Sequence, residues 1–132
     1  MRKIAVLLAG IATLTSAIAV AASTDGPEAK LARALEGRVA GTPVHCLNLR
    51  DIRSTQIIDG KAILYEAAGG KIYVNKPASG ASSLRWGSVM VTKSSSSQLC
   101  NVDIVRLYDS GSRIQSGAIG LGDFVPYTKV KS

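Results

Sequence analysis

Two cysteines are the residues of this chain whose types and spacing most directly suggest chemistry. Cys46 and Cys100 are the only cysteines among its 132 residues. They could form a disulfide, bind zinc or act as a catalytic thiol. Zinc would need further ligands, and only His45, next to Cys46, could help. Neither a Cys-x-x-Cys motif nor a catalytic Cys–His pattern occurs, so we predict a disulfide and no metal site.

The predicted disulfide would contribute strongly to stability. It closes a loop of about 54 residues, for which the chain-entropy model gives roughly 4 kcal/mol. A small domain is stable by only about 5–15 kcal/mol in total. We therefore expect the bridge between Cys46 and Cys100 to decide whether the domain folds.

His45 is the only histidine, so a hydrolase of the serine type would have to use it as its base. Asp51 or Asp103 could orient the imidazole, and a serine-rich loop could supply the nucleophile. No Gly-x-Ser-x-Gly nucleophile elbow occurs. We expect His45 to be a surface residue beside the disulfide and assign no catalytic residue. A small periplasmic hydrolase that uses His45 is the alternative.

Arg85 and Trp86 are the best candidates for a recognition patch. They lie in a loop before Gly87, and tryptophan and arginine are over-represented at binding hot spots. A lone tryptophan in a small domain is more often a plug in the core or at the end of a barrel. The sequence is compatible with both interpretations of Trp86.

Charged residues follow both cysteines closely. Asp51 and Asp103 each lie within five residues of a cysteine, so a disulfide would bring the two carboxylates toward each other. Arginines would lie near them, namely Arg50, Arg53 and Arg106. We expect either a polar binding site that includes Arg50, Arg53 and Asp103, or salt bridges that only set the register of the strands.

The segment before the first cysteine predicts a short helix and its cap over residues 27–41. Pro27 is tolerated at the first helical position, and the residues that follow are good helix formers. Leu31 and Leu35 share one face because they are four residues apart. Gly37 is one of two glycines that can end the helix. We expect the leucine face to pack on the sheet or to cover an open barrel end; a mobile leader is the alternative.

A three-stranded antiparallel meander is the strongest structural signal in the chain. Its strands are expected at residues 54–58, 61–66 and 71–75. The first turn contains Asp59 and Gly60, a pair typical of a type I′ hairpin. Ile63 and Tyr65 are expected on one face and Leu64 on the other.

Three further strands are predicted at residues 88–93, 103–108 and 113–121. Pro126 is expected to end strand growth, and Phe124 and Tyr127 to seal the core. Six short strands with tight turns in about 85 residues favour a mainly β fold, a small six-stranded antiparallel barrel. Closure would also remove exposed strand edges. A two-sheet sandwich is the alternative, and in either case we place a single disulfide-bonded β domain at residues 44–128.

The N-terminus has the composition of a signal peptide. Basic residues at positions 2 and 3 precede a run of apolar and small residues, with small residues that allow cleavage after Ala21 or Ala22. A transmembrane anchor is the alternative, but polar residues interrupt the run and no charged stop-transfer flank follows it. We predict a cleaved signal peptide at 1–22, a linker at 23–26, and a periplasmic or secreted protein with no membrane span after cleavage.

The chain is moderately basic. Its formal net charge is +7, and loss of Arg2 and Lys3 with the signal peptide would leave +5. The basic residues are dispersed, which argues against a nucleic-acid partner. Attraction to anionic envelope polymers or lipid head groups is physically possible but non-specific. We predict no cofactor.

Two stretches carry a resemblance to a known family. The first cysteine is followed by Asp51-Ile52-Arg53-Ser54 and by Ile58-Asp59-Gly60, and the second stands within Leu99-Cys100-Asn101-Val102-Asp103. Over residues 31–127 the chain resembles a family of small exported proteins of Gram-negative bacteria, known only as a domain of unknown function. The resemblance implies an exported, disulfide-bonded β domain and transfers no activity.

These observations together favour a soluble, non-catalytic periplasmic domain. It would bind or support a cell-envelope component, which could be an envelope protein, a wall polymer or a lipid. Inhibition of a host lysozyme-like enzyme is a weaker hypothesis, because such enzymes are often basic and like charges slow encounter.

Overall fold

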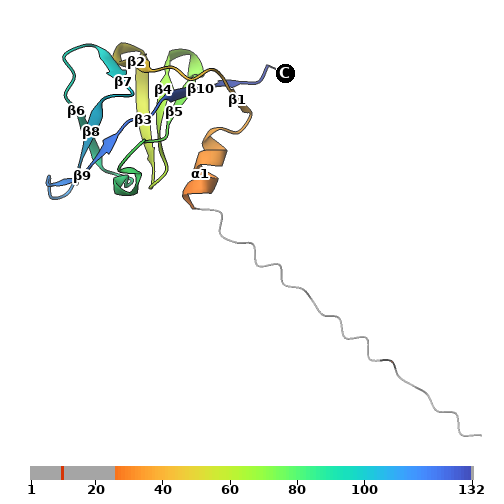
Figure 1. Ribbon diagram of the computed structural model, residues 1–132. Coiled ribbons are helices and arrows are strands. Elements are labelled where there is room, and N and C mark those ends of the chain that lie inside the picture. The colour runs from red at the N-terminus through yellow and green to blue at the C-terminus, as the bar shows by residue number, and fades with distance from the viewer. Residues whose placement is uncertain (1–9, 11–25, 132) are drawn as a thin grey trace, which may run out of the picture.

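The computed structural model describes residues 10 and 26–131 of the chain. The predicted signal peptide, apart from Gly10, and residues 23–25 of the predicted linker lie outside the described residues. The described part is mainly β, with ten strands in antiparallel sheets and one α-helix (Figure 1). Within it, no helix is both long enough and apolar enough to cross a bilayer.

The strands form three sheets. The largest has the order β1-β10-β5-β4-β3, a second has the order β6-β8-β9, and β2 and β7 form a short ribbon. The large sheet consists of β1 (Arg38–Ala40), β10 (Phe124–Lys129), β5 (Ile72–Asn75), β4 (Ala62–Ala67) and β3 (Ile52–Ile58). The three-stranded sheet consists of β6 (Val89–Thr92), β8 (Ile104–Tyr108) and β9 (Gln115–Gly120), and the ribbon of β2 (Cys46–Asn48) and β7 (Gln98–Cys100).

The predicted meander is confirmed as β3–β4–β5. Ile63 and Tyr65 pack in the main core, and Leu64 packs in a second cluster on the opposite face. The predicted type I′ turn between the first two strands is wrong. Gly60 has a positive φ of 65°, but Asp59 does not, and a type I′ turn needs positive φ at both central positions.

The predicted closed barrel is not confirmed. Among residues 26–131 no strand pairing joins β3 to β6, so the pairings leave separate sheets rather than one closed sheet. Four strands were not predicted: β1, β2, β7 and β10. Pro126 does not end strand growth but lies inside β10, where it stands opposite Tyr73 while its carbonyl accepts a hydrogen bond from Gly41 N–H at 2.7 Å.

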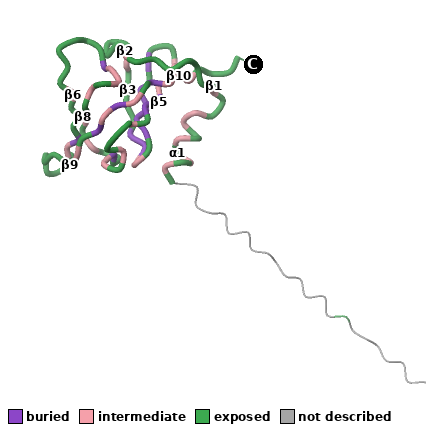
Figure 2. The backbone as a smooth tube through the Cα atoms, in the orientation of Figure 1, coloured by how far each residue is buried: buried purple, intermediate pink, exposed green. Residues whose placement is uncertain are grey.

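The main core lies between the two larger sheets and the ribbon. Its members are Leu47, Ile57, Ile63, Tyr65, Leu84, Leu99, Val105, Leu107, Ile119, Leu121 and Phe124. Figure 2 shows the buried residues gathered in the central strands, while the outer strands and loops are mostly exposed. Phe124 is fully buried and meets the Tyr65 ring edge-to-face at 5.7 Å between centroids. Tyr127 packs instead against the second cluster.

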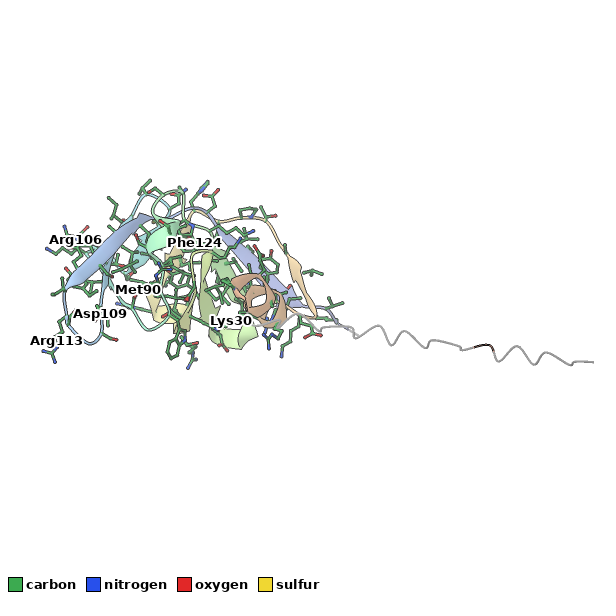
Figure 3. All side chains as sticks on the ribbon, turned by 90° about the horizontal axis from the view of Figure 1, so that it is seen from below. Lys30, Met90, Arg106, Asp109, Arg113 and Phe124 are labelled. Atoms are coloured by element: carbon green, nitrogen blue, oxygen red, sulfur yellow. A yellow bond between two sulfur atoms is a disulfide. The ribbon has the colours of Figure 1, made fainter. Side chains whose placement is uncertain are left out.

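The helix α1 (Pro27–Ala34) covers the outer face of the large sheet. It is shorter than predicted, because the chain turns at Gly37, with φ of 71°, and then enters β1. Leu31 and Leu35 pack against the second cluster, so the prediction that the leucine face packs on the sheet is confirmed. Figure 3 shows Lys30 of α1 and Arg106 of β8 on opposite sides of the molecule. Among the described residues the helix covers the large sheet, whereas Val89, Val91 and Ile104 of the three-stranded sheet remain exposed.

Candidate functional site

The predicted disulfide is present and joins the two strands of the ribbon. Cys46 and Cys100 are register partners in the β2–β7 pair, with their Cα atoms 4.0 Å apart. Leu47 and Leu99, the next pair in the ribbon, are both buried in the main core. The bridge thus ties the ribbon at one end while the leucines attach it to the core.

A polar cluster of three side chains lies beside this bridge. His45 Nδ1 is 3.0 Å from Asp123 Oδ1, and Asn101 Nδ2 donates to the same oxygen at 2.7 Å. Asn101 Nδ2 also lies 3.2 Å from His45 Nδ1. A ring nitrogen that donates to Asp123 cannot also accept from Asn101, so the arrangement favours His45 with its proton on Nδ1.

Backbone hydrogen bonds position each member of this cluster. Asn101 N–H donates to His45 O at 2.8 Å, across the end of the disulfide-linked ribbon. Val44 and Phe124 exchange two backbone hydrogen bonds, of 2.8 and 2.9 Å, which place Asp123 beside His45. The cluster therefore joins the ribbon to the start of β10.

A buried asparagine anchors the chain just before Asp123. Asn75, which is fully buried, donates from Nδ2 to Gly122 O at 2.7 Å and accepts from Gly122 N–H at 3.0 Å. A side chain at Gly122 would collide with the carbonyl oxygen of Lys76, so the two segments approach as closely as glycine allows.

The hydrogen bond from His45, and then that from Asn101, hold the pKa of Asp123 below its ordinary value. The side chains are nevertheless accessible: His45 is 77% and Asp123 46% exposed. The pair is therefore a surface interaction.

The cluster has two of the three groups that a catalytic triad needs. Asp123 orients the imidazole, not Asp51 or Asp103 as predicted. No serine hydroxyl contacts His45 within residues 26–131, and Ser94 Oγ of the serine-rich loop lies 2.9 and 3.0 Å from the carbonyls of Ser96 and Gln98. Both cysteines are oxidised, so neither can be a nucleophile. Groups of three metal-ligating side chains are also absent from the described part of the chain.

The Arg85–Trp86 loop projects from a different part of the surface. Trp86 is 75% exposed, so it is not the core or barrel-end plug that a lone tryptophan more often is. Its backbone is nevertheless held: Trp86 N–H donates to Asp59 Oδ1 at 2.6 Å, and Ser88 N–H donates to Arg85 O at 3.1 Å. Leu84, immediately before the loop, is fully buried and accepts from Gly60 N–H at 3.0 Å. The hairpin turn at Asp59 and Gly60 is thus the support of this loop.

Among the described residues, no hydrogen bond or ion pair joins Arg50, Arg53 and Asp103, the residues of the predicted polar site. Asp103 Oδ2 accepts from Cys100 N–H at 2.7 Å and so stabilises the turn after the second cysteine. Arg50 and Arg53 are exposed, and neither forms an ion pair with another described residue. Asp103 does share the rim of a surface depression of about 300 Å³ with Arg106.

The sequence predicts that two of the three members of the polar cluster lie close together. His45 and Asn101 each adjoin a cysteine, so the disulfide itself predicts that they lie close together. Asp123 carries no such signal, because its position depends on how the end of the chain returns to Val44 and Asn75.

The comparisons with known proteins give no family for this chain: no family model matches it, and neither does a curated protein or a solved structure.

Proposed function

We propose that this chain is an exported, non-catalytic binding domain that attaches to a cell-envelope component through the Arg85–Trp86 loop. The observation that carries the proposal is the combination of an indole that is 75% exposed with a backbone that is hydrogen-bonded to Asp59. An aromatic side chain held in this way can bury its surface on a partner without first losing much conformational freedom.

The gain available from one such side chain is considerable. A tryptophan buries about 150–250 Å² when covered, which corresponds to about 4–6 kcal/mol at 25 cal/mol per Å² before the costs of association. Arg85 adds a planar group with several hydrogen-bond donors beside the indole. Flat apolar faces and anionic groups on the partner would suit this pair, and an anionic wall polymer offers both.

Export is part of the proposal. The basic start of the chain, the apolar run after it and the small residues near Ala21 support it. The disulfide is compatible with an oxidising compartment. The resemblance to small exported proteins of Gram-negative bacteria points to the periplasm.

Co-sedimentation with purified cell-wall sacculi tests the wall-polymer form of the proposal. The described domain should sediment with them, and Trp86→Ala should reduce the bound fraction severalfold. Ile114→Ala is the matched control, because Ile114 is also a large exposed apolar residue, at 68%, in a different loop. Equal loss in both variants, or none in Trp86→Ala, would contradict the role of the loop. Binding to anionic vesicles or to an envelope protein instead would keep the loop but change the partner.

The hydrolase hypothesis has one observation in its favour, the hydrogen bond between His45 and Asp123. Generic ester, amide and glycoside substrates should be screened with the unmodified protein. An activity that His45→Ala abolishes would establish the hydrolase and contradict the non-catalytic proposal, whereas turnover that is unchanged in this variant would exclude His45 as the base.

A further inference from the structure

Two sheet edges face the same opening in this fold. β3 is the last strand of the large sheet and β6 the last of the three-stranded sheet. Within residues 26–131 each pairs on one side only, with β4 and β8 respectively. Unpaired edges are usually protected by charged residues or proline. β6, with the sequence Val89-Met90-Val91-Thr92, has neither.

A surface depression of about 250 Å³ is lined by residues of both strands and by residues of the main core. We call it the β3–β6 slot. Hydroxyl side chains from Thr55, Ser88 and Thr92 line it together with the apolar Met90 and Leu99, and Tyr65 also contributes. No charged side chain is part of its lining. Figure 3 shows Met90 on the inner side of the three-stranded sheet and Arg106 on its outer side.

Tyr65 places an unpartnered polar group in this slot. The residue is only 4% exposed, yet its hydroxyl makes no hydrogen bond to another described residue. Among the described residues, every fully buried side-chain oxygen or nitrogen has a hydrogen-bond partner, so an unpaired hydroxyl such as that of Tyr65 is not fully buried. The small exposed part of Tyr65 therefore includes its hydroxyl oxygen, and Tyr65 is one of the residues that line the slot. Burial raises the pKa of Tyr65, so the phenol stays a neutral donor.

We propose that the β3–β6 slot binds an extended, uncharged peptide segment of a partner protein. The segment adds a strand between β3 and β6, inserts a small aliphatic side chain beside Met90, and accepts a hydrogen bond from Tyr65 through a backbone carbonyl. Pairing of an extended segment with a free sheet edge is a general mode of peptide recognition.

Size and composition favour a peptide over other occupants. Pockets for small molecules and cofactors are about 300–1,000 Å³, so the slot falls below that range and suits one or two side chains. Thr55 of β3 and Met90 and Thr92 of β6 are part of its lining, and such edge strands offer alternating N–H and C=O groups to an extended backbone. An anionic polymer would find no cation in the lining, so this site is separate from the proposed role of Arg85 and Trp86.

Selection from a library of displayed random heptapeptides, followed by NMR with the enriched peptide, tests the proposal. The enriched sequences should alternate aliphatic and small uncharged residues. The peptide should shift the backbone amides of β3 and β6 and slow their hydrogen exchange at least about tenfold, as new pairing would. The same peptide with alternate N-methyl groups, which removes its donors, should not bind.

Three variants make the test specific to the slot. Tyr65→Phe should weaken the enriched peptide about tenfold, as loss of one buried hydrogen bond does, and leave the melting temperature of the free domain unchanged or higher. Thr92→Phe should fill the slot and abolish binding, whereas Val91→Phe, on the outer face of β6, should not.

Several results would overturn the proposal. They are a selection without enriched sequences, amide shifts confined to the Trp86 loop or to the outer face of β6, and a Tyr65→Phe domain that melts at a lower temperature. Shifts in β3 and β6 that depend on protein concentration without peptide would assign the slot to a second copy of the chain instead.

Discussion

The carboxylate of Asp59 accepts a hydrogen bond from the backbone N–H of Trp86 at 2.6 Å, across 27 residues of sequence. Asp59 belongs to the turn between β3 and β4, and these strands pair without a register shift from Ser54 to Ile58. The exposed indole is thereby displayed by a loop that has a rigid support.

Replacement of Asp59 should therefore mobilise Trp86. We expect Asp59→Ala to lower the free energy of unfolding by about 1–2 kcal/mol, because the lost hydrogen bond has a charged acceptor. Trp86 is the only tryptophan, so its fluorescence anisotropy reports on this loop alone. The anisotropy should fall in Asp59→Ala and fall less in Asp59→Asn, which keeps an acceptor oxygen. Equal anisotropy in all three proteins would show that Asp59 does not hold the loop.

Asn75 should be among the residues most sensitive to substitution. Asn75→Leu leaves the Gly122 N–H and C=O without their partners, and we expect a loss of about 2–3 kcal/mol in urea unfolding. Gln56→Leu, at an exposed position of β3, is the control and should change stability by less than about 0.5 kcal/mol. A small effect at Asn75 would mean that the segment at Gly122 finds other hydrogen-bond partners.

Arg113 is the only described residue other than glycine with a positive φ, at 61°. It lies in a turn where Asp109 Oδ1 accepts from the N–H groups of Gly111 and Ser112, at 2.9 and 2.7 Å. The left-handed conformation costs a side-chain-bearing residue about 1–2 kcal/mol. Arg113→Gly should therefore be more stable than Arg113→Ala by about 1 kcal/mol in thermal unfolding. Equal melting temperatures would show that the turn relaxes out of this conformation in solution.

The surface pair of Asp123 and His45 should make stability depend on pH at the acidic end. A carboxyl group whose pKa is lowered on folding stabilises the protein above its unfolded value, here 3.8, and this contribution is lost as pH falls through the lower folded pKa. Asp123→Asn should thus destabilise the domain at pH 7.

The same substitution should have a smaller effect at a pH below the folded pKa, where the carboxyl of the unmodified protein is protonated too. Urea unfolding at both pH values measures the difference. Asp51→Asn is the control, because the Asp51 side chain makes no hydrogen bond to a described residue. An Asp123→Asn effect that does not change with pH would mean that the interaction does not depend on the charge.

The disulfide should be required for stability. We expect the double variant Cys46→Ala/Cys100→Ala to lose about 2–5 kcal/mol, as small domains do when a native bridge is removed. The loss should appear as a lower urea midpoint, and a reducing agent should give the unmodified protein a similar midpoint while leaving the variant unchanged. An unaltered midpoint would show that Leu47 and Leu99 hold the ribbon without the bridge.

Local patterns determined much of this protein. Alternation of apolar residues predicted the three-stranded meander, and leucines four residues apart predicted the face with which α1 packs. The lack of further zinc ligands near Cys46 and Cys100 predicted that the two cysteines form a disulfide. The predictions for the meander and for α1 hold because a period of two or of about 3.6 residues sets which side chains share a face, whatever the rest of the chain does.

Only the tertiary structure decided which distant segments meet. The short strands β1, β2, β7 and β10 form because their partners lie beside them, and a three-residue strand carries almost no periodicity of its own. Asp123 meets His45 across 78 residues, and Asp59 supports Trp86 through a backbone N–H that no side-chain pattern reveals. The opening between β3 and β6 likewise depends on how the two sheets pack. The sequences of these two strands are equally consistent with a closed barrel and with separate sheets, because the core side chains set the distance between the strands.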